Sequence, residues 1–299
     1  MHQRTSVPLA YRVAGMAYFR CCGALLATLL IGTGTAFADL AAINDDVAAL
    51  ATAFAREVDK TLAVPIGDQA SYAGMLRAAL ARAGKKAVQP EFVMLVDRSP
   101  AVQAAFLYWI SADDWRFIGA SPVATGLPGA YEHFLTPLGV FEHTVANMDF
   151  RAEGTFNEFG IRGYGLKGVR VFDFGWVTAE RGWGGGGISP MRLQMHATDP
   201  ILERLLGIAH SAGCIRIPAT LNRFLDHHGI LDADYERAAR LGTHLSILLS
   251  DREPTPWAGR YLVIIDSQRS KRPAWSPLPG KQAPHSPSSL GLDTPRSRT

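Results

Sequence analysis

The sequence predicts a mostly β, α+β fold, a sandwich of mixed sheets with short helices, preceded by a small helical segment. Short apolar or alternating runs separated by Gly and Pro fill the chain from residue 91 onward, which is the pattern of β-strands. Before them, apolar residues recur in steps of three and four, as in amphipathic helices. Hydrophobic residues are 47% of the 299, which is enough for a globular core and excludes a wholly disordered chain.

The first 38 residues have the layout of a secretory signal peptide. Three arginines precede a short apolar run, and an A-x-A cleavage site follows it. These features are Arg4, Arg12 and Arg20, the run 23–31, and Ala36-Phe37-Ala38. The run is shorter than the roughly 20 apolar residues that span a bilayer, so cleavage is favoured over a retained membrane anchor. We predict an exported protein of the periplasm or cell envelope.

Residues 39–88 predict a helical N-terminal segment. Apolar positions from Leu40 to Val58 advance at helical spacing, and Pro65 ends this first helix. A second helix is expected to begin with Ser71 as its N-cap and to stop at Gly84.

Six runs between residues 91 and 196 predict strands, because they are short, apolar or alternating, and bounded by turn residues. They are 92–96, 104–110, 115–121, 139–143, 169–174 and 191–196. With the elements that follow, they form a predicted domain over 89–252, and a terminal strand lies within 253–266.

Helix signals return after residue 198. Asp199 caps a short helix with Pro200 in its first position, Pro218 opens a second helix that runs to Gly229, and a third fits 232–242. Strands are expected at 244–249 and 261–265. The last segment, 267–299, is rich in Pro, Ser and basic residues, and predicts a disordered tail.

Charge excludes one class of partner. The net charge of +3 comes from the two ends, because residues 39–266 carry 21 basic against 26 acidic side chains. This middle is a poor nucleic-acid binder, so no nucleic-acid partner is predicted.

Cys214 is the residue that most needs an explanation. Cys21 and Cys22 would leave with the signal peptide, and a lone cysteine in an oxidising compartment cannot form an internal disulfide. It is then buried and inert, paired between chains, or chemically active.

His196 is the natural partner for a reactive Cys214. Cysteine catalysis needs a thiolate, a histidine that takes and returns a proton, and N–H donors for the developing oxyanion. A neighbouring imidazolium lowers a thiol pKa from about 8.5 to about 3.5–7.5, so a thiolate is expected at Cys214. His196 ends a predicted strand, and Cys214 lies in a turn before a predicted helix. Considered singly, a buried cysteine and a hydrogen-bonded histidine are the ordinary interpretations.

Spacing favours the chemical interpretation. Fourteen residues separate His196 from Ser211, and Ser211-x-Gly213-Cys214 follows. This resembles the signature of the L,D-transpeptidases (the YkuD-type catalytic domain), a histidine followed after fourteen to seventeen residues by Ser/Thr-His-Gly-Cys. Similar stretches are the opening strand pair 92–110, Ala124-Thr125-Gly126, Thr136 to Phe141 and Gly242 to Leu245, so the resemblance covers roughly 91–250.

The resemblance implies a role for each residue of the motif. Cys214 would be the nucleophile and His196 the general base. The backbone carbonyl of Ala197 would orient the imidazole, and N–H groups around Gly213 and Cys214 would form the oxyanion hole.

Ser211 and Arg216 are expected at the substrate, with Arg216 positioning a carboxylate. One departure is Ala212, which stands where the family usually has histidine. It leaves the acceptor and the tuning of Cys214 open.

The implied reaction is acyl transfer on peptidoglycan stem peptides, which cross-links them or attaches a wall protein. It needs no cofactor and no metal ion. The alternatives are an L,D-carboxypeptidase or amidase that hydrolyses the same bonds, and a non-catalytic wall-binding protein. A zinc site at His196, His210 and Cys214 fits no common ligand spacing, and His227-His228 is expected to offset a helix dipole.

Overall fold

The computed structural model describes residues 44–85, 89–127, 129 and 131–276. The chain divides into two compact units, 1–45 and 46–299, and the second contains nearly all of the described residues. The predicted signal peptide lies outside the described residues. Within these ranges, no helix has both the length and the apolar character that crossing a membrane requires.

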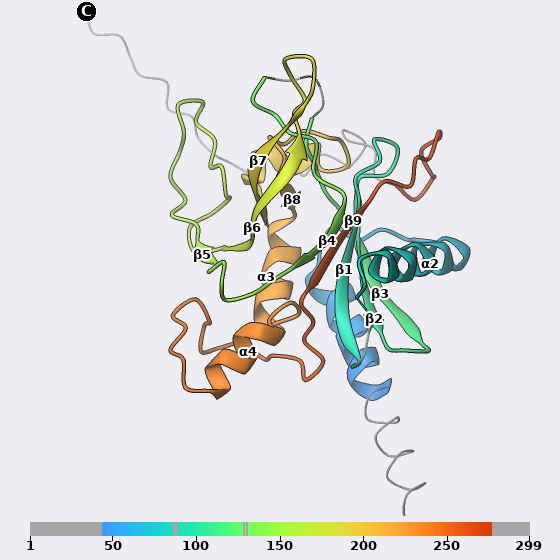
Figure 1. The fold of residues 1–299 in the computed structure, drawn as a ribbon. Coiled ribbons are helices and arrows are strands. Elements are labelled where there is room, and N and C mark those ends of the chain that lie inside the picture. Colours follow the sequence, from blue (N-terminus) through green and yellow to red (C-terminus); the bar gives the residue numbers. More distant parts are fainter. Residues whose placement is uncertain (1–43, 86–88, 128, 130, 277–299) are drawn as a thin grey trace, which may run out of the picture. The chain divides into compact units, whose positions relative to one another are not determined.

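Two mixed β-sheets form the centre of the second unit (Figure 1). The five-stranded sheet has the order β3 (Trp115–Pro122), β2 (Ala104–Ile110), β1 (Glu91–Asp97), β9 (Tyr261–Ile265), β4 (Gly139–Glu142). The four-stranded sheet has the order β5 (Phe150–Arg151), β6 (Arg170–Glu180), β7 (Ile188–Ala197), β8 (Ile215–Ile217). One pair in each sheet is parallel, β1 with β9 and β7 with β8. The predicted class, mostly β with mixed sheets and short helices, is confirmed.

The helices also occur where the sequence predicts them. They are residues 44–57, α2 (Ile66–Arg82), the 3-10 helix η1 (Pro200–Leu205), α3 (Ala219–His227) and α4 (Ala233–Arg240). Asp199 caps η1 as predicted, since its side chain accepts the amide of Ile201. The Ser71 N-cap is wrong, because α2 begins five residues earlier after an extended Pro65.

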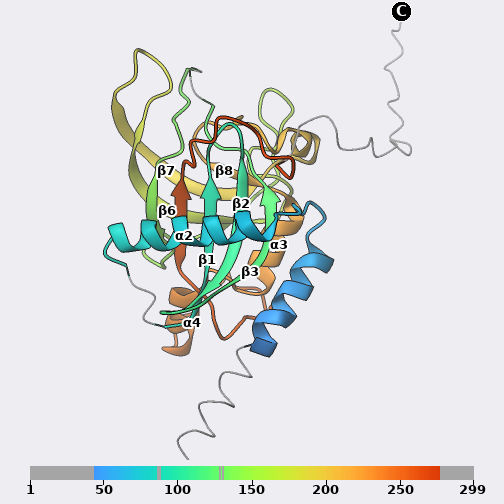
Figure 2. The ribbon, with the colours of Figure 1, turned by 90° about the vertical axis from the view of Figure 1, so that its right-hand side faces the viewer.

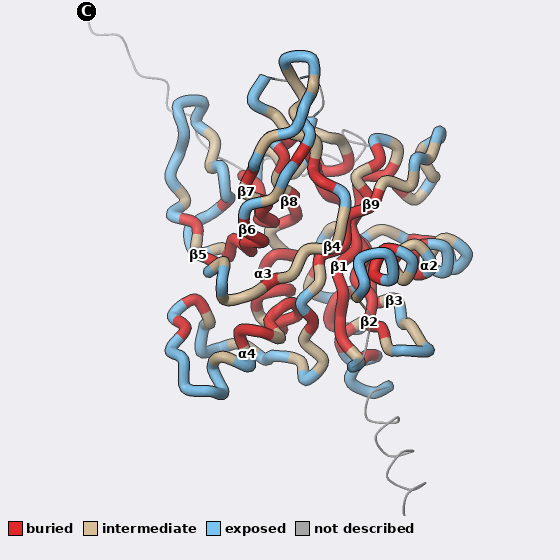
Figure 3. Tube along the Cα trace, viewed as in Figure 1, coloured by how far each residue is buried: buried red, intermediate tan, exposed pale blue. Residues whose placement is uncertain are grey.

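Helix α2 crosses the five-stranded sheet (Figure 2) and shares its core. Tyr72 and Leu76 are completely buried, and the Tyr72 ring stacks on Phe106 of β2 with centroids 4.1 Å apart. β1 and β2 are buried along their whole length, as the red segments of Figure 3 show for this region. Helix α2 of the N-terminal segment therefore belongs to the same hydrophobic core as β1 and β2.

The predicted disorder is wrong for residues 267–276. Trp275 packs edge-on against Tyr72 and Phe106, and its indole N–H donates to Asp68 at 2.6 Å. The hydroxyl of Ser276 donates to the carbonyl of Val102 at 2.8 Å. One large aromatic ring compensates for the polar composition that predicted disorder, while residues 277–299 lie outside the described residues.

The predicted strand over 244–249 is also wrong. Leu245 and Ile247 pack on Tyr235 of α4, and the Leu248 amide donates to the Leu245 carbonyl at 3.0 Å to close a turn. Alternating apolar residues satisfy a small cluster beside a helix as well as they satisfy a sheet face, so the pattern alone misled. The resemblance of Gly242 to Leu245 to a closing strand fails with it.

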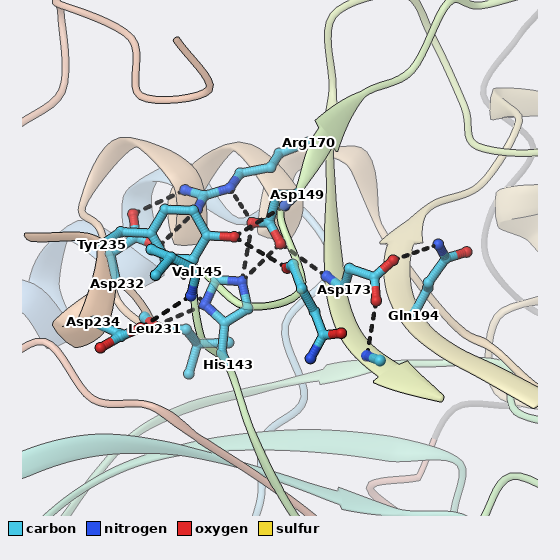
Figure 4. A network of polar contacts seen from close by, with 12 residues as sticks. His143, Val145, Asp149, Arg170, Asp173, Gln194, Leu231, Asp232, Asp234 and Tyr235 are labelled. Carbon is cyan, nitrogen blue, oxygen red and sulfur yellow. Dashed lines mark hydrogen bonds and ion pairs between the residues drawn. The ribbon is translucent and has the colours of Figure 1, made fainter. Parts of the chain in front are cut away.

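A buried arginine connects the four-stranded sheet to the helices (Figure 4). Arg170, at the start of β6, has no exposed surface. It donates to Asp149 at 2.6 Å and, through both terminal nitrogens, to Asp232 at 2.8 Å. A third aspartate, Asp226 of α3, lies 3.2 Å away. A buried charge is stable only when it is paired, so this cluster fixes the positions of the segments that supply it.

His143 extends the cluster with a second cation. Its Nδ1 lies 2.9 Å from the carbonyl of Leu231 and its Nε2 lies 2.9 Å from Asp149. Both partners are acceptors, so both ring nitrogens must carry protons. Burial alone lowers the pKa of His143, but the charge and hydrogen bond of Asp149 raise it above its ordinary value.

We predict that Arg170→Met destabilises the fold by about 3–5 kcal/mol, because it removes the buried cation shared by Asp149 and Asp232 and leaves them only His143 and Arg252 as partners. Urea unfolding would measure the loss. Arg237→Met is the matched control, because Arg237 is a mostly exposed partner of Asp234, and surface pairs contribute about 0–1 kcal/mol. Equal losses in the two variants would contradict the assignment.

We further predict that the fold loses stability as pH rises through the raised pKa of His143. The proton on His143 contributes stability that is fully present below the unfolded-state pKa of about 6.5 and disappears above the folded-state value. In His143→Gln, this alkaline decline should be absent while the overall stability is lower. Unfolding free energies of both proteins across that pH window give the comparison, and parallel profiles would contradict it.

Candidate active site

His196 and Cys214 lie on one face of the four-stranded sheet. Strands β7 and β8 run parallel, with Met195 opposite Ile215 and His196 opposite Arg216. Cys214 directly precedes β8, so it stands beside Gln194. Side chains alternate between the faces of a strand, and these four polar residues therefore project together while Met195 and Ile215 enter the core.

The imidazole of His196 is held as a neutral base. Its Nδ1–H donates to the carbonyl of Ala197 at 2.7 Å, which leaves Nε2 as the acceptor nitrogen. Burial lowers the pKa of His196 to about 4, and the charge of Arg216 acts in the same direction. The contact with Ala197 is the one that the resemblance implied, and it is formed by the backbone.

The surroundings of Cys214 disfavour the thiolate that the sequence predicts. Burial raises the pKa of the Cys214 thiol, and the charge of Asp173 adds to this, although the backbone amide of Gln194 and the charge of Arg216 act against it. The thiol is close to the carbonyl of Arg192, at 3.8 Å. Among the described residues, no hydrogen bond joins Sγ to the imidazole. Both pKa shifts favour the neutral forms of the two groups, a thiol and an imidazole.

The turn that carries Cys214 is braced by two hydroxyl groups. The Ser211 hydroxyl donates to the Cys214 carbonyl at 2.6 Å and accepts the Gly213 amide at 3.1 Å. The Thr136 hydroxyl donates to the Gly213 carbonyl at 2.7 Å and accepts the Gly126 amide at 2.8 Å. Ser211 is 1% exposed and both partners of its hydroxyl lie within the turn, so it braces the turn and does not face the substrate as the sequence predicts.

Two glycines are required by this packing. Gly213 has φ +127°, where a side chain is strained, and a Cβ there would lie 3.0 Å from Met191. A Cβ on Gly126 would lie 1.9 Å from the carbonyl oxygen of Phe134. The Thr-Gly and Thr-Pro stretches of the sequence thus both contact the turn that carries Cys214.

The element that follows Cys214 differs from the prediction. Cys214 is followed by the short strand β8 before α3 begins, and this strand was not predicted.

Basic side chains gather around Arg216. Arg216 donates to the carbonyl of His210 at 2.8 Å, and Cys214 is close enough to affect its pKa. Burial lowers the pKa of His133, and the charges of Arg216 and His210 lower it further, so the three groups are neighbours. His133 comes from the loop before Thr136 and had no sequence signal.

Tyr164 is a second neighbour that sequence reasoning missed. Its ring meets the His196 ring edge-on with centroids 4.8 Å apart, and its hydroxyl donates to Gln194 at 2.9 Å. Gln194 in turn donates to Asp173 at 2.9 Å. The Asp173 amide donates to Asp149, so hydrogen bonds and one ring contact connect the buried arginine cluster to His196. Tyr164 also lines a cavity of about 360 Å³ with residues 150, 151, 153–155, 163 and 165.

Comparisons with known proteins add little. No family model and no curated protein matches the chain. Among solved structures, a match is the helical cell shape determining protein Pgp2 from Campylobacter jejuni, at 14% identity and a TM-score of 0.30. The match covers 64% of this chain and 55% of that one, so the chain spans about half the length of Pgp2. These values give no basis for transferring a function.

We predict that alkylation of Cys214 by iodoacetamide accelerates with a midpoint pH above that of an unperturbed cysteine peptide, because burial disfavours the thiolate. Arg216→Gln should move the midpoint higher still, because it removes the cation that favours the charged sulfur. Mass spectrometry of the labelled protein across pH gives both midpoints. A midpoint below that of the peptide would show a thiolate already paired at rest.

Proposed function

We propose that this protein is a cysteine acyltransferase that acts on peptidoglycan stem peptides, an L,D-transpeptidase exported to the cell envelope. The observation that carries the proposal is that Cys214 and His196 share one face of the paired strands β7 and β8, with the His196 tautomer fixed by its bond to Ala197. The motif resemblance supplies the substrate class, and the signal-like N-terminus supports export.

The reaction begins with a neutral pair. Nε2 of His196 accepts the thiol proton while Sγ of Cys214 attacks the carbonyl between the diamino acid and the terminal D-alanine. The negative charge then moves to the carbonyl oxygen. The Gly213 amide already donates to the Ser211 hydroxyl, so the amide of Cys214 is the one that donates to the oxyanion.

Collapse of this intermediate completes the first half of the reaction, and attack by an acceptor is the second half. The imidazolium protonates the departing amine, D-alanine leaves, and a thioester remains on Cys214. An amine from a neighbouring stem or an attached protein then gives its proton to His196, attacks the thioester, and releases the thiol. Ser211 holds the turn in this scheme, while Arg216, next to His133 and His210, binds a substrate carboxylate.

Two alternatives share most of this scheme. In a carboxypeptidase or amidase, water replaces the amine in the second half. A wall-binding protein would bind the same peptides without forming the thioester. Incubating the mature protein with purified muropeptides separates the three, since dimers indicate transfer, trimmed monomers indicate hydrolysis, and unchanged peptides indicate binding.

We predict that Cys214→Ala lowers D-alanine release by roughly 10³-fold or more while the protein stays folded. His196→Ala should be nearly as damaging, and the double variant should be no worse, because nucleophile and base act as one unit. His244→Ala, at an exposed position away from the sheet face, is the control and should retain the parent rate. Thermal melts accompany each assay. A folded Cys214→Ala protein with parent activity would end the proposal.

A further inference from the structure

Three segments meet at the end of α3, far along the chain from Cys214. His227 is the last residue of α3 and His228 is its C-cap. The loop after α4 runs along this helix end, because the amides of Glu253 and Thr255 donate to the carbonyls of His227 and His228, both at 2.9 Å. The helix over 44–57 ends beside them at Glu57.

Nitrogen and oxygen donors converge at this junction. One donor atom from each of His227, His228 and Glu253 lies within 4.8 Å of the other two. Nε2 of His227 is 3.8 Å from a carboxylate oxygen of Glu253. Donors around a tetrahedral zinc ion, with bonds of about 2.0–2.2 Å, stand about 3.3 Å apart. The donors must therefore approach one another by about 0.5 Å for this pair and by at most about 1.5 Å for the others. The side chain of Glu253 is 79% exposed and that of His227 is 38% exposed, so both have room to move.

A carboxylate orients one of the two imidazoles. Nε2 of His228 lies 3.0 Å from Glu57, and the His228 side chain is largely buried. Histidines that bind metals usually bond their other ring nitrogen to a carboxylate, which fixes the ring. With Nε2 engaged by Glu57, Nδ1 of His228 is the nitrogen left for a metal ion.

Helix geometry favours a cation here as well. The C-terminus of a helix carries partial negative charge, and α3 points this end at the two imidazoles. Two imidazoles with one carboxylate suit zinc and its transition-metal neighbours, while magnesium and calcium prefer oxygen ligands alone.

We propose that His227, His228 and Glu253 bind one zinc ion, with Glu57 as the residue that positions His228. The ion links the end of α3 to the loop at 253–255, and the contact of His228 with Glu57 connects both to the end of the 44–57 helix. Solvent or a ligand from outside fills the fourth position, since His227 and Glu253 are exposed. This site shares no residue with the proposed acyl transfer and does not depend on it.

Titration of the mature protein with zinc chloride, followed by calorimetry, tests the proposal. All proteins carry Cys214→Ala, so that the thiol cannot capture the metal. We expect one zinc per chain and no binding of magnesium chloride. His227→Ala and Glu253→Gln should each weaken zinc binding by at least about tenfold, and Glu57→Gln by about tenfold through His228. His244→Ala is the matched control and should bind as the parent does.

Melting curves with zinc or with EDTA supply a second measurement. The parent should melt at a higher temperature in zinc, because binding only to the folded chain stabilises it. His227→Ala and Glu253→Gln change exposed side chains, so both should stay folded and lose this increase. Parent-like zinc affinity in both variants, or no zinc bound by the parent, would overturn the site.

Discussion

The buried guanidinium of Arg170 is the constraint on which the rest of this structure depends. It lies at the start of β6 and forms ion pairs with aspartates of the loop before β5, of α3 and of the N-cap of α4. Removing such a charge from water is costly, and only closely placed carboxylates compensate for it. The segments that supply Asp149, Asp226 and Asp232 therefore have little freedom to shift. Since β6 pairs with β7, this also fixes the strand that carries His196.

The candidate active site is held from two directions as a result. On the side of β6, Asp149 accepts the amide of Asp173, whose carboxylate accepts from Gln194. Gln194 accepts from Tyr164, and the ring of Tyr164 packs on the imidazole of His196. From the other side, the backbone around Gly126 and Thr136 supports the turn before Cys214. The bridge between Ala124 and Arg216 links the end of β3 to β8. Cys214 and His196 are thus held by different sets of contacts, and the two residues come together because β7 and β8 pair.

Burial decides the resting charge of this pair. Desolvation disfavours both the thiolate and the imidazolium, so the two groups remain neutral and close to each other. A neutral imidazole with Nδ1–H directed at a carbonyl keeps Nε2 as an acceptor, as the proposed reaction requires. Arg216 is the basic group next to Cys214, and His133 and His210 are neighbours of Arg216. The junction proposed for a metal ion at α3 differs, because two of its three donors, His227 and Glu253, are exposed.

Short-range patterns in the sequence were enough to predict the fold class, most helices and strands, and the two residues of the proposed chemistry. Apolar periodicity and local caps are short-range signals, and the spacing from His196 to Cys214 is a property of one continuous segment. Tertiary structure decided what depends on distant segments: the packing of Trp275 on Tyr72, the loss of a strand at 244–249, and the approach of Tyr164 and His133 to the site. It also decided that His228 meets Glu57 and Glu253, which a helix-end histidine pair does not reveal. Burial and charge pairing depend on neighbours across the fold. They raise the pKa of the Cys214 thiol, whereas the sequence alone predicted a lowered one.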